Sequence, residues 1–223
     1  MLLHLEGLNK AYSTNSDRVQ ALCGVSLQLE EGDFVAVQGP SGSGKSTLLL
    51  TSGTMLVPDS GNVVIFGETP YAMSANDRAA FRAKNIGFVF QQFYLVPYLT
   101  VFENVQVASL GLPASKRRTN SKVEQLLDQF GLTNRNRHYP SQLSVGERQR
   151  CCVARSLLND PKLLLADEPC GSLDDSNARI VMQALKRFSQ NGGAVLMVTH
   201  DSRAAQMADR VVQMQNGILS CSI

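Results

Sequence analysis

The chain has 223 residues, of which 43% are hydrophobic and 18% are charged, and its net charge is +2 at pH 7. This length and composition predict an ordinary globular protein with a sizeable core, and the charge is too small to favour a nucleic acid or an anionic membrane surface as a partner. We expect no signal peptide at residues 1–12 and no membrane-spanning helix, because no stretch approaches the ~20 consecutive apolar residues that such a helix needs.

Five short apolar runs predict β-strands, at 33–39, 62–67, 85–91, 161–168 and 193–201. Because the runs are continuous rather than alternating, they favour strands that are covered on both faces, as in a parallel sheet. The final segment, 210–219, ends with an Asn-Gly pair between two apolar halves. It therefore predicts a hairpin.

Helical patterns separate these strands. One begins after the glycine-rich turn at 39–44, and another places Val123, Leu126, Leu127 and Phe130 on one face. Two longer patterns cover 146–160 and 176–193, and the second ends at a pair of glycines. The sequence therefore predicts one α/β domain over 1–223. Its core would comprise about 1–92 and 160–223, and a helical subdomain would occupy about 93–159.

The five cysteines form neither a CxxC pair nor a spacing typical of zinc ligands. Their number is odd, and Cys151 and Cys152 are adjacent, which does not suit a framework of disulfides. We expect reduced and mostly buried thiols in a cytosolic protein.

A phosphate-binding loop is predicted at 39–47, where GPSGSGKST matches G-x-x-x-x-G-K-[ST] between a strand and a helix. In such a loop the backbone N–H groups converge on phosphate oxygens, the lysine reaches the β- and γ-phosphates, and the hydroxyl after it binds Mg²⁺. The predicted ATP-binding residues here are Gly39, Pro40, Ser41, Gly42, Ser43, Gly44, Lys45, Ser46 and Thr47.

Two carboxylates follow the apolar run at 161–166. Because ligands of parallel sheets sit at the carboxyl ends of the strands, Asp167 and Glu168 are expected beside the phosphates. Their side chains point to opposite sides, so we assign Asp167 to Mg²⁺ and Glu168 to the attacking water. The alternative is a solvated strand end with two surface acids.

His200 and Gln91 also end predicted strands. A histidine at the phosphate edge can hydrogen-bond the γ-phosphate or the water, although a lone histidine after an apolar strand is as readily structural. The Gln91 amide can bind Mg²⁺ and sense the γ-phosphate, but alone it is a weak signal.

The segment LSVGERQ at 143–149 predicts a second anion site. A serine and a small residue precede a long helical pattern, which is how a helix N-terminus made for an anion looks. The first loop already serves one nucleotide, so the sequence alone leaves open what the second site binds. The alternative is a helix that is simply capped.

Together these motifs resemble those of the ATP-binding cassette (ABC) ATPases. The phosphate loop, FVFQ, LSVGERQ, LLLADEP, SLD and VTHD stand in the order found in that family, and the resemblance covers essentially the whole chain. It implies a P-loop NTPase core with a parallel sheet, an antiparallel β-subdomain and an inserted helical subdomain. It also implies an ATPase that uses ATP and Mg²⁺.

The resemblance also implies roles for individual residues. Tyr12 would stack on adenine, Gln91 would be the Q-loop glutamine, and Glu168 and His200 would be catalytic together with Lys45. Two chains would close head to tail over two nucleotides. The partner's ATP would then meet Ser144, Val145, Gly146, Glu147 and Asp174.

Two residues depart from the common LSGGQ signature: Val145 replaces a glycine and Glu147 replaces a glutamine. The negative charge of Glu147 would lower phosphate affinity unless it turns outward or pairs, for which Arg148 and Arg150 are candidates. Ser144 and Gly146, which carry the contacts in the family, are retained, so we expect an active site.

The segments 19–47 and 85–105 more loosely resemble those of the lipoprotein-release, macrolide-export and cell-division group (LolD, MacB and FtsE types). That resemblance implies a homodimer at the cytoplasmic face of the inner membrane, attached peripherally and driving a separate membrane permease. The apolar stretch from Gln91 to Phe102 would be the docking site for the permease, with the core of the helical subdomain as the alternative.

Three other functions compete with this one. A regulatory cell-division ATPase cannot be separated from an exporter by sequence. A soluble ABC ATPase that acts on DNA or the ribosome would usually carry tandem cassettes, long coiled-coil inserts or zinc motifs. A P-loop GTPase or small-molecule kinase would leave LSVGE unexplained.

Overall fold

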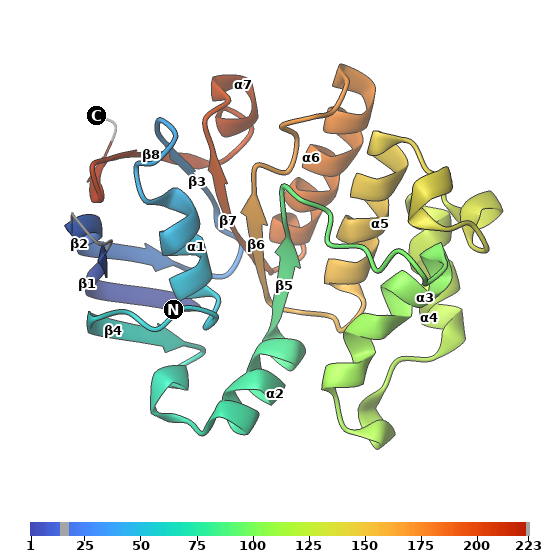
Figure 1. Ribbon diagram of the computed structural model, residues 1–223, viewed down its shortest axis with the longest axis horizontal. Helices are drawn as coiled ribbons and strands as arrows, with labels where there is room; N and C mark the ends of the chain where they lie inside the picture. Colours follow the sequence, from blue (N-terminus) through green and yellow to red (C-terminus); the bar gives the residue numbers. More distant parts are fainter. Residues whose placement is uncertain (14–17, 222–223) are drawn as a thin grey trace.

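The computed structural model describes residues 1–13 and 18–221, which form two sheets (Figure 1). The smaller sheet is antiparallel, in the order β2-β1-β4, and comprises β1 (Leu3–Ser13), β2 (Arg18–Leu29) and β4 (Ser60–Ile65). The larger sheet has the order β5-β6-β7-β3-β8-β9. Its strands are β3 (Phe34–Gln38), β5 (Ile86–Val89), β6 (Leu163–Asp167), β7 (Ala194–Thr199), β8 (Arg210–Gln215) and β9 (Ile218–Cys221).

The larger sheet confirms most of the predicted strands. Strands β3, β5, β6, β7 and β8 pair in parallel, and β8 with β9 form the expected antiparallel hairpin. At its turn Asn216 and Gly217 have φ values of 49° and 77°, the left-handed conformation that a tight hairpin turn requires.

The prediction for 62–67 as a strand of the parallel sheet is wrong. This segment belongs to β4, which pairs antiparallel with β1. Val63 and Ile65 are buried whereas Val64 is only half-buried, because one face of the smaller sheet packs on the core and the other faces outward.

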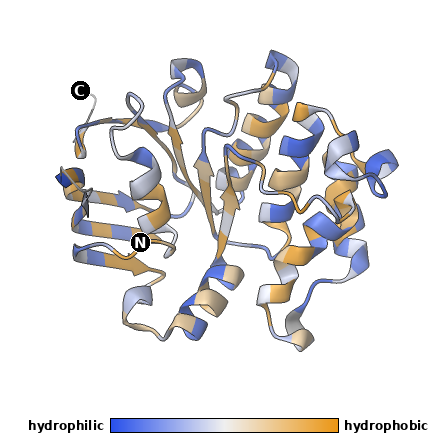
Figure 2. Cartoon of the chain, in the orientation of Figure 1, coloured by the Kyte–Doolittle hydropathy of each residue, from blue (hydrophilic) through white to orange (hydrophobic). Residues whose placement is uncertain are grey.

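Alternate residues of the parallel strands enter two separate cores. In β3, Phe34 and Ala36 join the cluster under the helices, whereas Val35 and Val37 join the cluster between the two sheets. The same alternation holds along β6 and β7, which Figure 2 shows as a strongly hydrophobic centre. Both faces of the sheet are therefore covered, as the continuous apolar runs predict.

Seven α-helices surround this sheet in the described part of the chain. They are α1 (Lys45–Ser52), α2 (Ala75–Asn85), α3 (Val101–Gln106), α4 (Asn120–Gln129), α5 (Val145–Leu157), α6 (Asp175–Gln190) and α7 (Ser202–Ala205). Helix α1 packs against strands of both sheets, and α6 packs on the opposite face of the larger sheet, against β7. Helix α2 was not among the predicted elements.

Between 93 and 159 the described residues form helices and turns and no strand. Besides α3, α4 and α5, this part contains the short 3-10 turns η2 (Val107–Gly111), η3 (Ala114–Lys116), η4 (Thr133–Arg135) and η5 (Pro140–Gln142). A further turn, η1 (Pro70–Ala72), precedes α2. The helical part lies to one side of the larger sheet and the antiparallel sheet to the other (Figure 1).

The cysteines whose side chains the structure describes are all free thiols: Cys23, Cys151, Cys152 and Cys170. Cys151 and Cys152 are buried, and burial raises the pKa of their thiols to about 12 and about 11. Among residues 1–13 and 18–221, no helix has both the length and the apolar character needed to cross a bilayer.

Candidate active site

A cavity of about 630 Å³ lies at the carboxyl ends of β3, β6 and β7. Its lining residues are Tyr12, Val19, Ala21, Pro40, Ser41, Gly42, Gly44, Lys45, Ser46, Thr47, Gln91, Asp167, Glu168 and His200. The predicted nucleotide residues therefore gather from five separate parts of the chain. Gly39 and Ser43 belong to the same turn but do not line the cavity.

The glycine-rich turn that leads from β3 into α1 wraps closely on its neighbours. A Cβ atom at Gly39 would lie 2.1 Å from the carbonyl oxygen of Met214, and one at Gly44 would lie 2.1 Å from that of Ala21. Lys45 Nζ donates to the carbonyl oxygens of Gly39 and Pro40, both at 2.8 Å. These contacts hold the ammonium group across the mouth of the turn.

Asp167, the last residue of β6, lies against the start of α1. The Ser46 hydroxyl hydrogen-bonds its carboxylate. Burial and the neighbouring Glu168 raise the pKa of Asp167, whereas the bond from Ser46 and the charge of Lys45 act in the opposite direction. A carboxylate beside a serine hydroxyl is a set of hard oxygen donors, which suits Mg²⁺ bound to phosphate. Gln91 lines the same cavity.

Glu168 is buried, with 8% of its surface exposed, and its carboxylate is held on two sides. Oε2 accepts a hydrogen bond from Thr199 Oγ1 at 2.8 Å, and Oε1 accepts one from the backbone N–H of His200 at 2.8 Å. His200 Nδ1 lies 2.6 Å from Oε1. The backbone of Glu168 has φ of 45°, a disfavoured conformation that these bonds stabilise.

Two residues of the set are largely exposed. His200 has 63% of its side chain exposed, and it lines the cavity while Nδ1 contacts Glu168. Tyr12 is 42% exposed, and its hydroxyl lies 3.5 Å from Thr47 Oγ1. An exposed aromatic ring that lines the cavity can stack on a planar base. Sequence reasoning did not identify Thr199, whose hydroxyl orients Glu168.

The signature segment lies outside this cavity, at the N-terminus of α5. Ser144 caps the helix: its Oγ accepts from the Glu147 N–H at 3.2 Å, and Glu147 Oε2 accepts from the Ser144 N–H at 2.8 Å. Ser144 and Val145 are exposed, whereas Gly146 is buried. An exposed helix N-terminus of this kind attracts anions.

Glu147 does pair with an arginine, but the two predicted partners are wrong. Its Oε1 accepts from Arg135 Nε at 2.8 Å. Arg148 instead donates to the carbonyl oxygen of Leu143, and Arg150 to that of Phe130. Arg148 directly follows Glu147 and points to another side of the helix. Arg150, one turn further on, is engaged by Phe130 and Asn177. Arg135 of η4 lies alongside the start of α5 and takes their place.

Asp174 is an exposed residue that caps α6. Its carboxylate accepts from Ser176 Oγ at 2.6 Å and from the backbone N–H and Nδ2 of Asn177 at 2.9 and 2.6 Å. These hydrogen bonds hold the pKa of the carboxyl well below its usual range. The sequence predicts Asp174 as a contact of the partner's ATP, but it does not predict that Asn177 holds the Asp174 carboxylate.

Asn177 also joins α6 to the signature helix. Its Oδ1 accepts a hydrogen bond from Arg150 of α5. A Cβ atom at Gly146 would lie 2.3 Å from Asn177 Cγ, so the glycine leaves room for this side chain. Asn177 therefore ties the start of α6 to the start of α5. An asparagine three residues after a cap is the only sequence signal that could have identified it.

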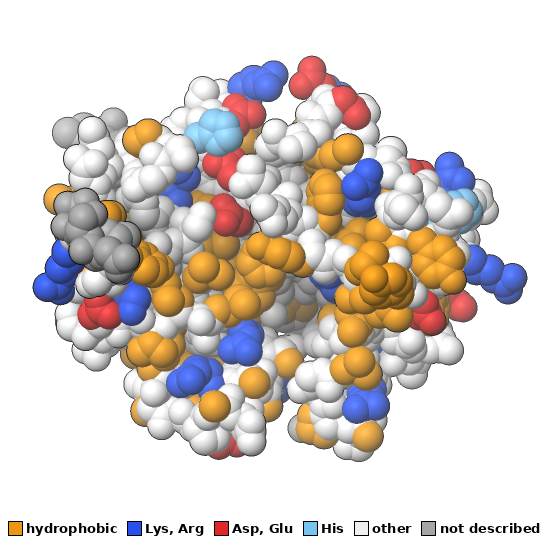
Figure 3. Space-filling view, viewed as in Figure 1, with side chains coloured by type: hydrophobic (Ala, Val, Ile, Leu, Met, Phe, Trp, Pro, Cys, Tyr) orange, Lys and Arg blue, Asp and Glu red, His pale blue; other side chains and the backbone are white. Residues whose placement is uncertain are grey.

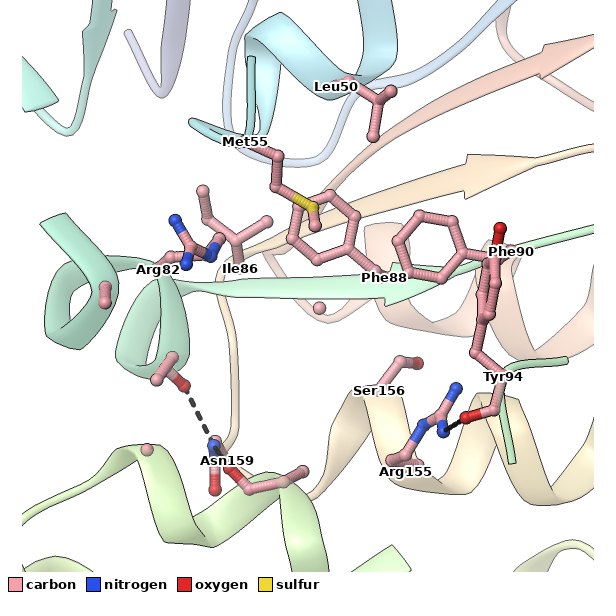
Figure 4. A pocket seen from close by; sticks show the side chains of 15 residues that line it. Leu50, Met55, Arg82, Ile86, Phe88, Phe90, Tyr94, Arg155, Ser156 and Asn159 are labelled. Carbon is pink, nitrogen blue, oxygen red and sulfur yellow. Dashed lines mark hydrogen bonds between the residues drawn. The ribbon is translucent and has the colours of Figure 1, made fainter. Parts of the chain in front are cut away.

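A second cavity, of about 670 Å³, opens between α2, β5 and the C-terminal end of α5 (Figure 4). Its lining is mostly apolar; along one wall Phe88 stacks on Phe90, and the Phe90 ring meets the Tyr94 ring edge to face. Arg155 of α5 donates to the carbonyl oxygens of Tyr94 and Phe93 at 2.6 and 2.8 Å. Hydrophobic side chains border the hollow that divides this face of the molecule (Figure 3).

The apolar stretch from Gln91 to Phe102 divides between surface and core. Tyr94 and Tyr98 are 62% and 86% exposed, whereas Leu95 and Phe102 pack against the core beneath the helices. Within this stretch Gln91 lines the first cavity and Tyr94 lines the second.

Comparison with known proteins places the chain among relatives that match it nearly end to end. Residues 22–171, more than half of the chain, match the family described as "ABC transporter". The lipoprotein-releasing system ATP-binding protein LolD 1 of Rhodopirellula baltica is 41% identical over 98% of this chain and 96% of its own length. The macrolide export ATP-binding/permease protein MacB of Bdellovibrio bacteriovorus is 38% identical over 98% of this chain, which spans only 33% of that protein.

A solved structure with a similar fold is the dimeric post-hydrolysis state of the ATP-binding cassette MJ0796, bound to ADP and Pi. It is 33% identical, with a TM-score of 0.89, and the match covers 99% of this chain and 98% of that chain.

Proposed function

The chain belongs to the ABC transporter family of ATP-binding proteins, and from this premise we propose how its residues divide the binding and hydrolysis of ATP. As a member of the family it is the ATP-hydrolysing subunit of a transporter. Tyr12 stacks on adenine, and the turn at 39–47 surrounds the phosphates with Lys45 facing their negative charge. One observation carries the proposal: a single cavity gathers this turn, the two carboxylates at the end of β6 and His200.

Ser46, Gln91 and Asp167 would hold Mg²⁺ beside the phosphates. The hydroxyl and the carboxylate already contact each other, and both are oxygen donors of the kind that this ion prefers. When bound, the ion supplies positive charge to the phosphate oxygens as the terminal phosphoryl group is transferred.

Glu168 orients the attacking water and accepts its proton. Thr199 and the His200 backbone fix the direction of the carboxylate, so its position is set before the water arrives. His200 hydrogen-bonds the γ-phosphate or the water from the exposed side. Catalysis by these groups consists of positioning and electrostatic stabilisation.

The second phosphate surface serves the nucleotide of another copy of the chain. Ser144, the backbone of Gly146 and the N-terminus of α5 would contact the γ-phosphate of ATP in the partner subunit, with Val145, Glu147 and Asp174 around them. A dimeric relative with 33% identity supports this arrangement. The exposure of Ser144 in the single chain supports it as well.

The closure of two chains over ATP would move a further partner, an integral membrane permease. MacB relatives are named ATP-binding/permease proteins, and this chain matches only a third of one, 33% of its length. We place the docking site in the second cavity, with Tyr94 at its edge, rather than along the whole stretch from Gln91 to Phe102. The chain would then act peripherally at the cytoplasmic face of the inner membrane, with 93–159 as a helical subdomain.

The first test compares Glu168→Gln with Glu124→Gln, the same chemical change at an exposed position on α4. Glu168→Gln should bind ATP, accumulate as a dimer and lose turnover by about 10²–10⁴-fold. Glu124→Gln should match the parent in all three. Near-normal turnover in Glu168→Gln would remove the base from the mechanism.

The docking site is tested with two variants of equal exposure. Met55 and Val57 are each 52% exposed, but only Met55 lines the second cavity. Met55→Glu should lose an integral membrane protein that co-purifies with the parent from native membranes, and Val57→Glu should retain it. Equal recovery by both variants would move the docking site elsewhere.

A further inference from the structure

The acidic residue of the signature segment, Glu147, opposes the binding of phosphate at this surface. Glu147 lies in the first turn of α5, three residues after Ser144. A negative charge there repels an incoming phosphate. Only 17% of the Glu147 side chain is exposed, so water screens its charge less than it would at the open surface.

Both carboxylate oxygens of Glu147 are nevertheless engaged. Oε2 accepts from the backbone N–H of Ser144, and Oε1 accepts from Arg135 Nε, each at 2.8 Å. Arg135 comes from η4, twelve residues earlier in the chain, and its side chain is 45% exposed. The pKa of Glu147 falls to about 2, with the bond from Arg135 as the largest cause and the bond from Ser144 next.

The two bonds have a joint consequence for Ser144. Because Glu147 takes the Ser144 N–H and its own N–H goes to Ser144 Oγ, the serine hydroxyl can donate its proton outward. The guanidinium of Arg135 binds the carboxylate oxygen that the cap leaves free, so the carboxylate is held at both ends. A Glu147 released from Arg135 would keep its charge and would be held only by the Ser144 N–H.

We propose that Arg135 is a positioning residue of the signature site, which neutralises Glu147 and holds its carboxylate so that Ser144 and the N-terminus of α5 can receive the γ-phosphate of the partner's ATP. The inference rests on the proposed role of the signature surface. It assigns Arg135 a function that exists only because residue 147 is acidic. With glutamine at 147, Arg135 has nothing to neutralise.

This dependence separates the proposal from an ordinary surface ion pair, which contributes little to folding. If the pair only stabilised the fold, Arg135→Ala would lower the Tm slightly and leave dimerisation alone. If Arg135 positions Glu147, the effect of Arg135→Ala on ATP-driven dimerisation is large with glutamate at 147 and absent with glutamine there.

The experiment uses the Glu168→Gln chain with Mg·ATP and measures the ATP concentration that produces half-maximal dimer by light scattering. Arg135→Ala should raise that concentration by about tenfold, because an uncompensated charge then lies beside the phosphate. Glu147→Gln should stay within about twofold of the parent, and Arg135→Ala/Glu147→Gln should match Glu147→Gln. Arg135→Lys, which keeps the charge, should recover part of the loss.

Arg137→Ala is the matched control, since Arg137 is also exposed and its loss changes the net charge equally. It should dimerise like the parent. If the parent itself forms no dimer with ATP, the proposed function of the signature surface fails. If the parent dimerises and Arg135→Ala dimerises equally well, or the double variant stays as weak as Arg135→Ala, the role of Arg135 is overturned.

Discussion

The cavity at the end of the parallel sheet and the surface at the starts of α5 and α6 are both proposed to bind phosphate, but they are built differently. In the cavity, residues from distant parts of the chain meet, and the buried Glu168 is held by partners more than thirty positions away. On the surface, Ser144 and Asp174 are exposed and are held by residues three positions along their own helices. The residues proposed for the cavity all come from one chain, whereas the role proposed for the surface requires a second copy. We therefore expect that one chain suffices to bind ATP and that hydrolysis needs two.

Lys45→Ala tests the cavity, and Ser144→Ala tests the surface at the start of α5. Lys45→Ala removes a cation that faces phosphate, and it should weaken ATP binding by a single chain by about 10–100-fold, the worth of a hydrogen bond to a charged group. Ser144→Ala should leave single-chain binding unchanged and prevent ATP-driven dimerisation. Binding of a fluorescent ATP analogue at low protein concentration, followed by light scattering, measures both. Weak single-chain binding in Ser144→Ala would mean that the surface is not a separate half-site.

Gly146→Ala tests how tightly the two helix starts are joined. Its Cβ would overlap Asn177, and such overpacking costs about 1–3 kcal/mol, so the Tm should fall by about 3–10 °C. Adding Asn177→Ala removes the obstructing side chain and should recover part of the loss. Thermal unfolding of the single and double variants decides this. A double variant no more stable than Gly146→Ala would show that Asn177 is not the obstacle.

Thr199→Val tests the positioning of Glu168 inside the cavity. Valine has nearly the same shape but cannot donate to Oε2, and a hydrogen bond of this kind is worth about 1 kcal/mol. We expect kcat to fall by about fivefold to tenfold, with ATP binding and dimerisation unchanged. Steady-state ATPase assays measure the loss. An unchanged kcat would mean that the backbone N–H of His200 orients the carboxylate by itself.

The smallest expected effect is on the pH dependence of stability, through Glu147. Its folded pKa is about 2, below the ordinary value of 4.5, so the ionised carboxylate stabilises the fold above pH 4.5. That contribution is lost as the pH falls toward 2. The Tm of the parent should therefore drop more than the Tm of Glu147→Gln between pH 6 and pH 3. Parallel melting curves at the two pH values measure it, and equal drops would contradict the depressed pKa.

The sequence predicted elements that carry an unbroken apolar run or an apolar helical face, and it missed elements that have neither. Helix α2 buries none of its residues, so it has no apolar face to detect. In β1 the alternation of Leu3 and Leu5 is interrupted at Gly7, where φ is 58° and the register with β2 shifts. A pattern of period two cannot be followed through such a bulge.

The candidate site also has parts that the sequence predicts and parts that it does not. Motifs that are contiguous in the chain, such as 39–47, can be recognised from their letters alone. The Arg135–Glu147 and Arg150–Asn177 contacts depend on how η4, α5 and α6 lie against one another. Nothing local in the sequence selects Arg135 over Arg148 or Arg150 as the partner of Glu147, and the nearer arginines were the wrong choice.

Helix α5 is long enough to connect the signature segment with the second cavity. It has 13 residues and is therefore about 20 Å long. Ser144 caps one end, and near the other end Arg155 donates hydrogen bonds to two carbonyl groups beside the second cavity. If a partner bound in the second cavity tilted α5 by about 5° about its C-terminal end, Ser144 at the N-terminal end would move by about 2 Å. That distance separates a formed hydrogen bond from a broken one.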